Sequence, residues 1–464
     1  MDARSATARL ETMAGQPSRW GVLSKRAAKG RPSLTACRSL LDRYACGMRT
    51  LTVFTLLTII TLRAENWPAW RGPLGTGIST EKNLPTEWSA TKNVRWKTPL
   101  PERGNSSPVV WGNRVFVTQA IEKEGRRTLM CFDRANGKLL WQKGVVYKEK
   151  EVTHGTNPYC SASPVTDGDR VIVSHASAGL VCYDMEGKEL WRRELGPQKH
   201  IWGNGASPVI YKNLVILNHG PGEPTFLVAL DKTNGTEVWR HDEPGGHSGE
   251  KKEGEKNKWV GSWTTPILMN VKGKDQLVMS YPGRVAAFDP VAGKELWACR
   301  GLNELVYTSP LYGNGIVVAM GGYGGTAMAT RIGEKGDVTA THRLWTRPKE
   351  QQRIGSGVLH DGHVYILNAT GIAQCINVKS GKSLWQERLK GKGARGGSWS
   401  SMVLAGDKIY AINQSADTFI LKASPKFKLL ATNSISETTQ SSIAVSNGEL
   451  FIRTYKHLWC ISVK

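Results

Sequence analysis

The chain has 464 residues and is rich in glycine (50 residues) and tryptophan (17 residues). Many glycines together with many tryptophans are typical of a β-repeat array, in which tight turns and one aromatic packing position recur. The formal charge is +23, and residues 1–64 hold eleven basic and three acidic side chains, which leaves +15 on residues 65–464. There the basic side chains are scattered through turns and form no clustered patch or reading motif, so we expect no nucleic-acid partner.

The N-terminal region divides into two parts. Residues 1–47 are polar and basic without periodicity, and we interpret them as a non-native or disordered extension. A short apolar run from Leu51 to Leu62 then follows a basic residue and ends beside Ala64. This is the pattern of a secretory signal peptide, and the run is short for a membrane span. We therefore expect a signal peptide over 48–64, export to the periplasm or the extracellular space, and no transmembrane segment in the mature chain.

One unit recurs along the remaining chain. It consists of a Ser-Pro-like start, an apolar strand, an Asp-Gly or Gly-Asn turn, two further strands, a Gly-Lys turn and a tryptophan. The copies lie over 106–141, 161–191, 205–239, 263–297, 307–345, 355–385, 400–433 and 440–464, the last two being degenerate. Each unit has the length and the four short strands of a propeller blade, and no stretch has a sustained helical period. We predict an all-β fold, an eight-bladed β-propeller of four-stranded antiparallel blades.

The last unit supplies only three strands. Residues 94–100 read like an isolated fourth strand, with Trp96 in the tryptophan position. We predict that this N-terminal strand completes the last blade, because closure of the ring removes the exposed sheet edges of a linear array. The propeller domain then covers 94–464, and residues 65–93 form an N-terminal arm.

Tryptophan and cysteine each recur at a fixed place in the unit. A sugar-binding or electron-transfer role could be considered for the tryptophans, but their identical position favours packing between neighbouring blades. Cysteine alternates with alanine at one position, which indicates a small buried side chain, and equivalent cysteines are too far apart to bridge. The structural tryptophans are Trp96, Trp141, Trp191, Trp239, Trp297, Trp345 and Trp385, and the equivalent cysteines are Cys131, Cys182, Cys375 and Cys460.

Few residues suggest chemistry. Asp133, Asp184, Asp231 and Asp289 each precede a glycine-containing turn, and turn capping explains them better than metal binding. There is no C-x-x-C, no haem-attachment motif and no adjacent pair of cysteines. We therefore assign no catalytic residue and no metal site.

The irregular residues before the first strand of each unit are more informative. The first strand of a blade is innermost, so these residues should gather at the mouth of the central channel. A ring of Trp, His, Asn and Arg is typical of a surface that binds a ligand or a peptide, although such residues can also simply satisfy one another within loops. The candidate surface comprises His154, Asn157, His200, Trp202, Asn204, Trp259, Trp263, Tyr307, Arg353, Arg395 and Trp399, with Arg103, Asn105 and Tyr159 beside them.

A family resemblance supports the fold. The phrase A/C-φ-D-x-x-x-G-K-x-x-W, found at 131–141 and 287–297 and with one change each at 229–239 and 375–385, resembles the tryptophan-docking repeat of the PQQ-like (quinoprotein-type) β-propeller family. The segment 66–73, NWPAWRGP, is similar to the start of exported members of that family. The family includes quinoprotein alcohol and glucose dehydrogenases and the non-catalytic, BamB-type scaffold of the outer-membrane β-barrel assembly machinery.

The resemblance implies different functions in different branches. The dehydrogenases typically stack the quinone on a vicinal disulfide, hold Ca²⁺ with acidic and amide side chains and use an Asp base, and this chain has no adjacent cysteines. We therefore expect a monomeric, non-catalytic binding or scaffold protein without a cofactor, which offers its channel-mouth loops to a protein or peptide partner. Two alternatives stay open: a quinoprotein oxidoreductase with PQQ and Ca²⁺, and a propeller that recognises polysaccharide through Trp202, Trp259 and Trp399.

Overall fold

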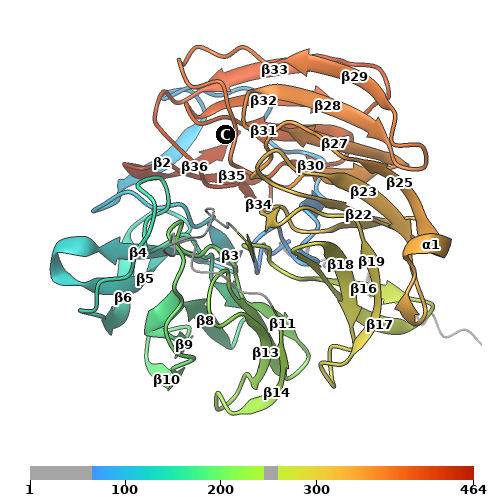
Figure 1. The fold of residues 1–464 in the computed structure, drawn as a ribbon. Helices are drawn as coiled ribbons and strands as arrows, with labels where there is room; N and C mark the ends of the chain where they lie inside the picture. Colours follow the sequence, from blue (N-terminus) through green and yellow to red (C-terminus); the bar gives the residue numbers. More distant parts are fainter. Residues whose placement is uncertain (1–64, 245–259, 464) are drawn as a thin grey trace, which may run out of the picture. The chain divides into compact units, whose positions relative to one another are not determined.

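The computed structural model describes residues 65–244 and 260–463, and within them eight four-stranded antiparallel sheets surround one axis (Figure 1). The predicted extension 1–47, the predicted signal peptide 48–64 and Trp259 lie outside the described residues. The predicted eight-bladed propeller is confirmed. In the part of the chain that the structure describes, no helix is both long and apolar enough to cross a bilayer.

The first four blades follow the chain from the innermost strand outward. Blade 1 contains β3 (Val109–Trp111), β4 (Arg114–Ile121), β5 (Arg126–Asp133) and β6 (Leu139–Val146). Blade 2 contains β7 (Val165–Thr166), β8 (Arg170–Ser174), β9 (Leu180–Asp184) and β10 (Glu189–Arg193). Blade 3 contains β11 (Val209–Tyr211), β12 (Leu214–His219), β13 (Phe226–Asp231) and β14 (Glu237–Asp242). Blade 4 contains β16 (Ile267–Val271), β17 (Lys274–Tyr281), β18 (Arg284–Phe288) and β19 (Glu295–Arg300), with the short β24 (Gly336–Asp337) parallel to β19.

The other four blades continue in the same order. Blade 5 contains β21 (Leu311–Gly313), β22 (Ile316–Met320), β23 (Ala327–Arg331) and β25 (Arg343–Arg347). Blade 6 contains β26 (Val358–His360), β27 (His363–Leu367), β28 (Ile372–Asn377) and β29 (Ser383–Arg388). Blade 7 contains β30 (Val403–Ala405), β31 (Lys408–Ile412), β32 (Asp417–Lys422) and β33 (Leu429–Ser434), with β1 (Ile78–Ser79) parallel to β30. Blade 8 contains β34 (Ala444–Ser446), β35 (Glu449–Arg453), β36 (His457–Ser462) and β2 (Val94–Pro99).

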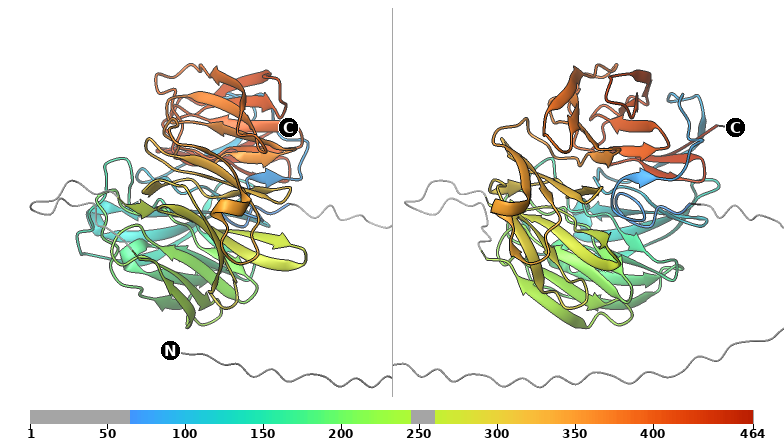
Figure 2. Two further views of the ribbon diagram at one scale, coloured as in Figure 1. Left: turned by 45° about the vertical axis from the view of Figure 1, so that its right-hand side comes forward. Right: turned by 90° about the vertical axis from the view of Figure 1, so that its right-hand side faces the viewer.

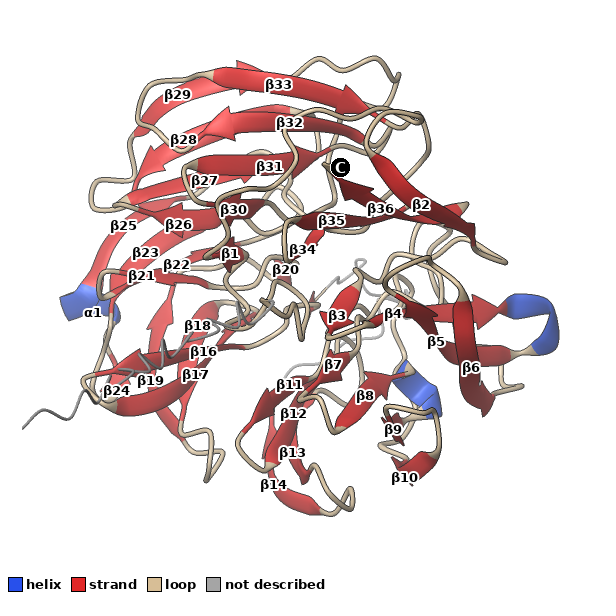
Figure 3. Cartoon of the chain, turned by 180° about the vertical axis from the view of Figure 1, so that it is seen from behind, coloured by secondary structure: helices blue, strands red, loops and turns tan. Residues whose placement is uncertain are grey.

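Helices and additional strands are short (Figure 3). The helical turns are η1 (Glu122–Glu124), η2 (Ala176–Ala178) and α1 (Thr339–His342). One two-stranded parallel pair joins β15 (Gly261–Ser262) to β20 (Leu305–Val306), between the loops that lead into blades 4 and 5.

The ring closes through the N-terminal strand, as predicted. Strand β2 pairs antiparallel with β36, and Trp96 lies opposite Cys460 in the register. Figure 2 shows this blue N-terminal strand beside the red C-terminal strands. Blade 8 is therefore built from both ends of the propeller sequence, and no blade boundary is left as an open edge of the ring.

The recurring tryptophans dock on the next blade. In five blades the indole N–H donates to the carbonyl that follows the turn Asp or its equivalent, at 2.7–3.1 Å. Trp385 donates one residue further on, to the carbonyl of Ser424 at 3.2 Å. Trp297 instead donates to Gln276 Oε1 of its own blade at 2.9 Å. The turn aspartates cap their own turns, as Asp231 does by accepting from the N–H of Thr233 at 2.7 Å. The six described cysteines are buried and free, and Cys131, Cys182 and Cys375 each pair across the sheet with a docking tryptophan.

A ring of hydroxyl groups links the innermost strands. Just before each innermost strand, the backbone N–H of a Ser or Thr donates to the hydroxyl of the equivalent residue in the next blade, at 2.8–3.0 Å. The eighth bond returns to the first residue, so the ring is closed. Its members are Ser107, Ser163, Ser207, Thr265, Ser309, Ser356, Ser401 and Ser442. This ring accounts for the Ser-Pro-like start of each repeat unit.

Candidate functional site

A cavity of about 410 Å³ lies inside the hydroxyl ring and opens among the loops that precede the innermost strands. We call it the chamber. Its walls combine aromatic side chains, amides and small hydroxyl residues. They comprise Trp70, Asn105, Ser107, His154, Thr156, Asn157, Ser161, Trp202, Asn204, Gly205, Ser207, Trp263, Thr265, Tyr307, Tyr323, Gln352, Ile354, Trp399, Ser401, Gln440 and Ser442.

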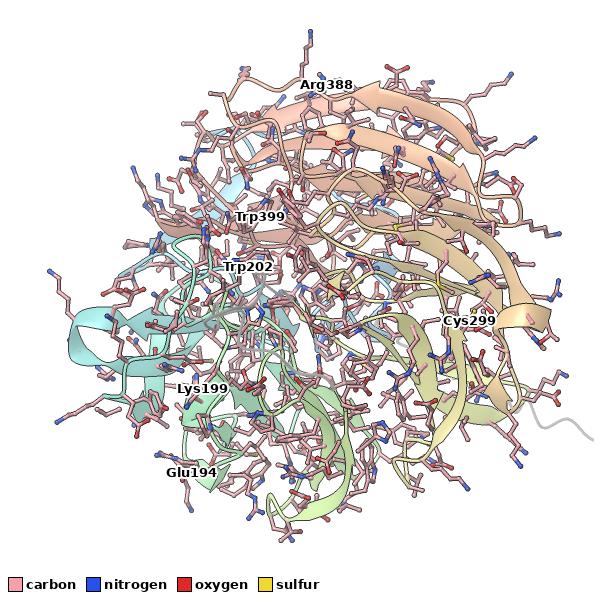
Figure 4. All side chains as sticks on the ribbon, in the orientation of Figure 1. Glu194, Lys199, Trp202, Cys299, Arg388 and Trp399 are labelled. Carbon is pink, nitrogen blue, oxygen red and sulfur yellow. The ribbon has the colours of Figure 1, made fainter. Side chains whose placement is uncertain are left out.

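Many of the residues predicted for the channel mouth meet in this chamber. They come from successive repeat units, and their common position before the innermost strand brings them to one end of the channel. In Figure 4, Trp202 and Trp399 lie toward the middle of the view, whereas Glu194 and Arg388 lie farther out. The predicted residues that line the chamber are Asn105, His154, Asn157, Trp202, Asn204, Trp263, Tyr307 and Trp399.

Other predicted residues do not line the chamber. Arg353 is fully buried, because its guanidinium forms an ion pair with Glu350 at 2.5 Å. His200 is 2% exposed, and its ring meets the ring of Trp263 edge-on at 4.8 Å, so it supports the wall from behind. Arg395 is exposed to solvent and does not line the chamber.

Two neighbours of the predicted surface also have structural partners. Arg103 donates to the carbonyl of Gly155 at 2.6 Å. Tyr159 donates to the carbonyl of Glu151 at 2.5 Å, and its ring lies under the guanidinium of Arg127 at 4.5 Å. Both residues therefore hold the loop before blade 2 in place.

One wall of the chamber is a continuous aromatic cluster. The ring of Trp263 lies 5.0 Å from Tyr307 and 5.9 Å from Trp202 between centroids. The indole N–H of Trp263 donates to the carbonyl of Gly203 at 2.7 Å, which joins the loops before blades 3 and 4. Burial raises the pKa of Tyr307, so its hydroxyl is neutral at physiological pH. This wall offers flat apolar faces with polar edges.

The amides around the chamber have two roles. Asn157 donates to the carbonyls of Trp202 and Asn204 at 2.6 and 2.9 Å and accepts from the hydroxyl of Ser161, so it fixes the loop before blade 3. Gln440, from the loop before blade 8, is 8% exposed, and its Oε1 has no hydrogen-bond partner among the described residues. A buried amide oxygen without a partner is costly, and a ligand in the chamber could supply the missing donor.

The N-terminal arm closes the opposite end of the channel. Trp67 exchanges two backbone hydrogen bonds of 2.9 Å with Val110 in blade 1, and Gly77 accepts one of 2.8 Å from Leu404 in blade 7. All three bonds use the channel-facing edge of an innermost strand. The segment between them therefore crosses the channel, and Trp70 within it forms the chamber floor. Figure 3, seen from behind, shows β1 of this arm beside β30 and β34.

A buried arginine holds the arm in place. Arg71 is 2% exposed and donates to the carbonyls of Gly75, Thr76 and Gly357, at 3.1, 2.5 and 2.6 Å. Burial lowers its pKa to about 9. Because Gly357 precedes the innermost strand of blade 6, these bonds anchor the floor to the wall of the channel.

Sequence reasoning missed several chamber residues. Trp70 lies in the arm, outside every repeat unit, so no repeat position pointed to it. Tyr323 lies in the glycine-rich loop between the second and third strands of blade 5, which reaches the same mouth by another route. Gln352 and Gln440 precede innermost strands, so the rule that found the other residues could have found them.

Solved structures with similar folds have different activities. The chain matches the crystal structure of BamB from Moraxella catarrhalis with a TM-score of 0.56 and 15% identity, over 79% of this chain and 96% of that chain. It matches quinohemoprotein alcohol dehydrogenase from Comamonas testosteroni with a TM-score of 0.60 and 11% identity, over 85% of this chain and 80% of that one. Such low identities establish a common fold and leave the activity open.

Sequence comparison gives one partial relative and one family. The 1-butanol dehydrogenase (quinone) of Thauera butanivorans is 24% identical over 196 residues, which is 38% of this chain and 30% of that protein. The chain thus spans less than a third of that relative. The family described as "Outer membrane protein assembly factor BamB" matches residues 76–146, 125–387 and 225–464. These matches cover nearly the whole propeller, and the chain belongs to this family of PQQ-like repeat β-propellers.

Proposed function

We propose that this chain is an exported, monomeric and non-catalytic binding protein, which presents the loops around its channel mouth to a protein or peptide partner. The observation that carries the proposal is the aromatic cluster of Trp202, Trp263 and Tyr307 at that mouth. Trp and Tyr dominate the energetic centres of protein interfaces, since they contribute large contact areas at a low cost in conformational entropy. The exposed Tyr323 and His154 extend this surface toward solvent.

The quinone alternative is less well supported by the chamber walls. Ca²⁺ binds six to eight oxygen ligands, usually including carboxylates, and PQQ itself carries carboxylates that need cationic partners. Among the described chamber residues there is no Asp, Glu, Lys or Arg. The described residues also contain no cluster of three His, Cys, Asp or Glu that could hold a metal ion. The residues present therefore do not fit a PQQ–Ca²⁺ group.

The sequence pattern at 48–64 and the family's description as an outer-membrane protein assembly factor support the proposed export. The similar BamB structure supports a protein partner, whereas the similar dehydrogenases support the alternative. The absence of Asp, Glu, Lys and Arg from the described chamber residues supports binding without catalysis.

Two measurements test this proposal. Calorimetric titration of residues 65–464 with PQQ, with and without Ca²⁺, should give no heat of binding. Stoichiometric binding of PQQ would contradict a non-catalytic role and would justify a screen of alcohols and aldoses as substrates.

The partner surface is tested by site-specific photocrosslinking in cells that make the protein natively. A photoreactive residue in place of Tyr323 should give one discrete crosslinked species, and Trp399→Ala in the same chain should abolish it. The matched control replaces Leu190, which is 43% exposed on the outer strand β10. Equal crosslinking from both positions, or none from Tyr323, would contradict the proposal.

A further inference from the structure

The N-terminal arm lies across the channel at the base of the chamber. The arm crosses the channel between blade 1 and blade 7, and Trp70 within the crossing segment forms the floor. The floor is built into the fold, because Arg71 beside Trp70 is buried and bonded to three carbonyls. An extended polymer cannot thread through such a channel. Only a compact ligand, or the end of a chain, can enter the chamber.

The charge of the chamber walls further restricts the class of ligand that fits. Among the described chamber residues there is no Asp, Glu, Lys or Arg, and the histidine among them, His154, lies at the exposed rim. Both ends of a peptide are charged at neutral pH, and a charge buried without a counter-charge is strongly disfavoured. A free peptide terminus or an anionic cofactor therefore fits the chamber poorly, whereas an uncharged compact ligand fits it well.

The chemistry of the walls matches a sugar ring. A pyranose has an apolar face of C–H groups and an edge of hydroxyls, each of which donates and accepts hydrogen bonds. Trp263, Tyr307 and Trp399 supply flat aromatic faces, and the amides of Asn204 and Gln440 supply both donors and acceptors. The buried Oε1 of Gln440, which has no partner among the described residues, would accept from a ligand hydroxyl.

The lower wall of the chamber and the volume of the chamber also suit a sugar. Ser401 and Ser442 line the chamber, and each hydroxyl accepts a backbone N–H and still carries its own O–H to donate. The volume of about 410 Å³ lies within the range of small-ligand sites, roughly 300–1,000 Å³, and accommodates a short saccharide.

We propose that the chamber binds the end of a neutral saccharide, with the sugar ring against the aromatic wall and its hydroxyls on the amides and the hydroxyl ring. This site goes beyond the proposed partner surface but shares Trp263, Tyr307 and Trp399 with it. Binding of a glycan end would place the propeller at the terminus of a polysaccharide chain, since a closed floor prevents binding along the chain's interior.

The test titrates residues 65–464 with cellobiose, maltose and N,N′-diacetylchitobiose, followed by tryptophan fluorescence and calorimetry. At least one of these neutral disaccharides should bind with a one-to-one stoichiometry, and digalacturonic acid, a charged disaccharide, should not. Trp399→Ala should weaken binding at least tenfold because it removes an aromatic face of the wall.

A second variant separates binding from folding. Gln440→Leu replaces a buried amide, whose Oε1 has no partner among the described residues, by an apolar side chain of similar size, so the fold should be about as stable as before. Its affinity for the disaccharide should nevertheless fall at least tenfold. Leu190→Ala, on the outer strand β10, is the control and should bind like the wild type.

Three results would overturn the proposal. The first is that no neutral disaccharide binds at concentrations on the order of tens of millimolar, which corresponds to negligible affinity. The second is equal binding by the wild type, Trp399→Ala and Gln440→Leu. The third is that an N-acetylated, C-amidated tripeptide of tryptophan and proline binds in a Trp399-dependent manner while the sugars do not. The crosslinking at Tyr323 is measured separately, without added saccharide, so the two proposals can fail separately.

Discussion

Two buried histidines are expected to make the stability of the protein depend on pH. His175 and His219 are 2% and 0% exposed, and the ring of His219 stacks on Phe226 at a centroid distance of 4.4 Å. Burial, together with the nearby guanidiniums of Arg127 and Arg240, lowers the pKa of each to about 3. In the folded protein both rings are therefore neutral at the pH values where an exposed histidine is protonated.

This difference predicts acid sensitivity. The unfolded chain binds a proton at each histidine near pH 6.5, whereas the folded chain does so only near pH 3. Between these values the unfolded state binds more protons, so stability falls as the pH is lowered, by up to about 1.4 kcal/mol per pH unit for each histidine. Urea denaturation at pH 7, 6 and 5 should show His219→Phe losing less stability than the wild type. Equal losses would contradict the prediction.

At the residue scale the sequence predicted positions better than side-chain directions. The repeat placed Trp263, Tyr307 and Trp399 correctly, because residues at one repeat position share one place in a symmetric ring. It placed Arg353 at the mouth, yet this side chain folds back to Glu350, three residues earlier. Repeat position determines where a backbone lies, whereas local charge partners determine where a long side chain points.

At the scale of elements, the turn between the third and fourth strands carries the contact between blades. Gly235 in blade 3 has φ +75°, and a Cβ there would lie 2.6 Å from Cε3 of Trp191 in blade 2. Glycine is thus required at position 235 for two reasons: the left-handed backbone and the close approach of the indole. Gly283, in the β17–β18 hairpin, has φ +80° with no atom within 4 Å of an added Cβ, so only the first requirement applies there.

These two glycines form a matched pair for mutation. Gly283→Ala should cost about 1–2 kcal/mol, the strain of a left-handed non-glycine residue. Gly235→Ala adds overpacking against Trp191, which typically costs a further 1–3 kcal/mol. Urea denaturation measures both losses. If the two variants lose the same stability, the docking contact between the indole and the turn contributes little.

The sequence did not predict the elements that depart from the repeat. Blade 5 has no Gly-Lys turn, and Trp297 of blade 4 instead packs against Gly333 and Val338, with β24 added beside β19. Because the segment that contains β24 resembles no other copy of the unit, the sequence offered no template for it. The docking position of Trp297 was evident from the repeat, but its partner was not.

At the scale of the whole molecule, the number of blades followed from counting. Eight copies of the unit, with three strands in the last and an isolated strand at 94–100, required the closure that the structure shows. The arm could not be derived in this way. Residues 65–93 match no repeat, and their path across the channel depends on contacts with blades distant in sequence, as Arg71 makes with Gly357.

The closing strand should control the stability of the ring. Trp96 is 7% exposed, its ring lies 6.1 Å from that of Phe451, and its indole N–H bonds to the carbonyl of Arg134 in blade 1 at 2.7 Å. Deleting residues 65–100 removes this contact and the whole pairing of β2 with β36, and it leaves exposed edges at blades 8 and 1. Loss of one buried tryptophan alone typically costs about 3–5 kcal/mol.

Calorimetric melting of residues 101–464 should therefore show a transition at a temperature well below that of residues 65–464.

The variants Trp96→Ala and Trp191→Ala provide a finer comparison. Both side chains are buried to a similar degree, at 7% and 8% exposure, and both dock on the next blade in the same way. The two substitutions should cost similar free energy at equilibrium, because they remove the same contact. Trp96→Ala should increase the unfolding rate more, since blade 8 is held to the ring at β2 by pairing alone, whereas blade 2 is covalently continuous with both of its neighbours. Equal unfolding rates would indicate that the ring opens at no preferred boundary, and an unchanged melting curve for residues 101–464 would show that closure by β2 does not stabilise it.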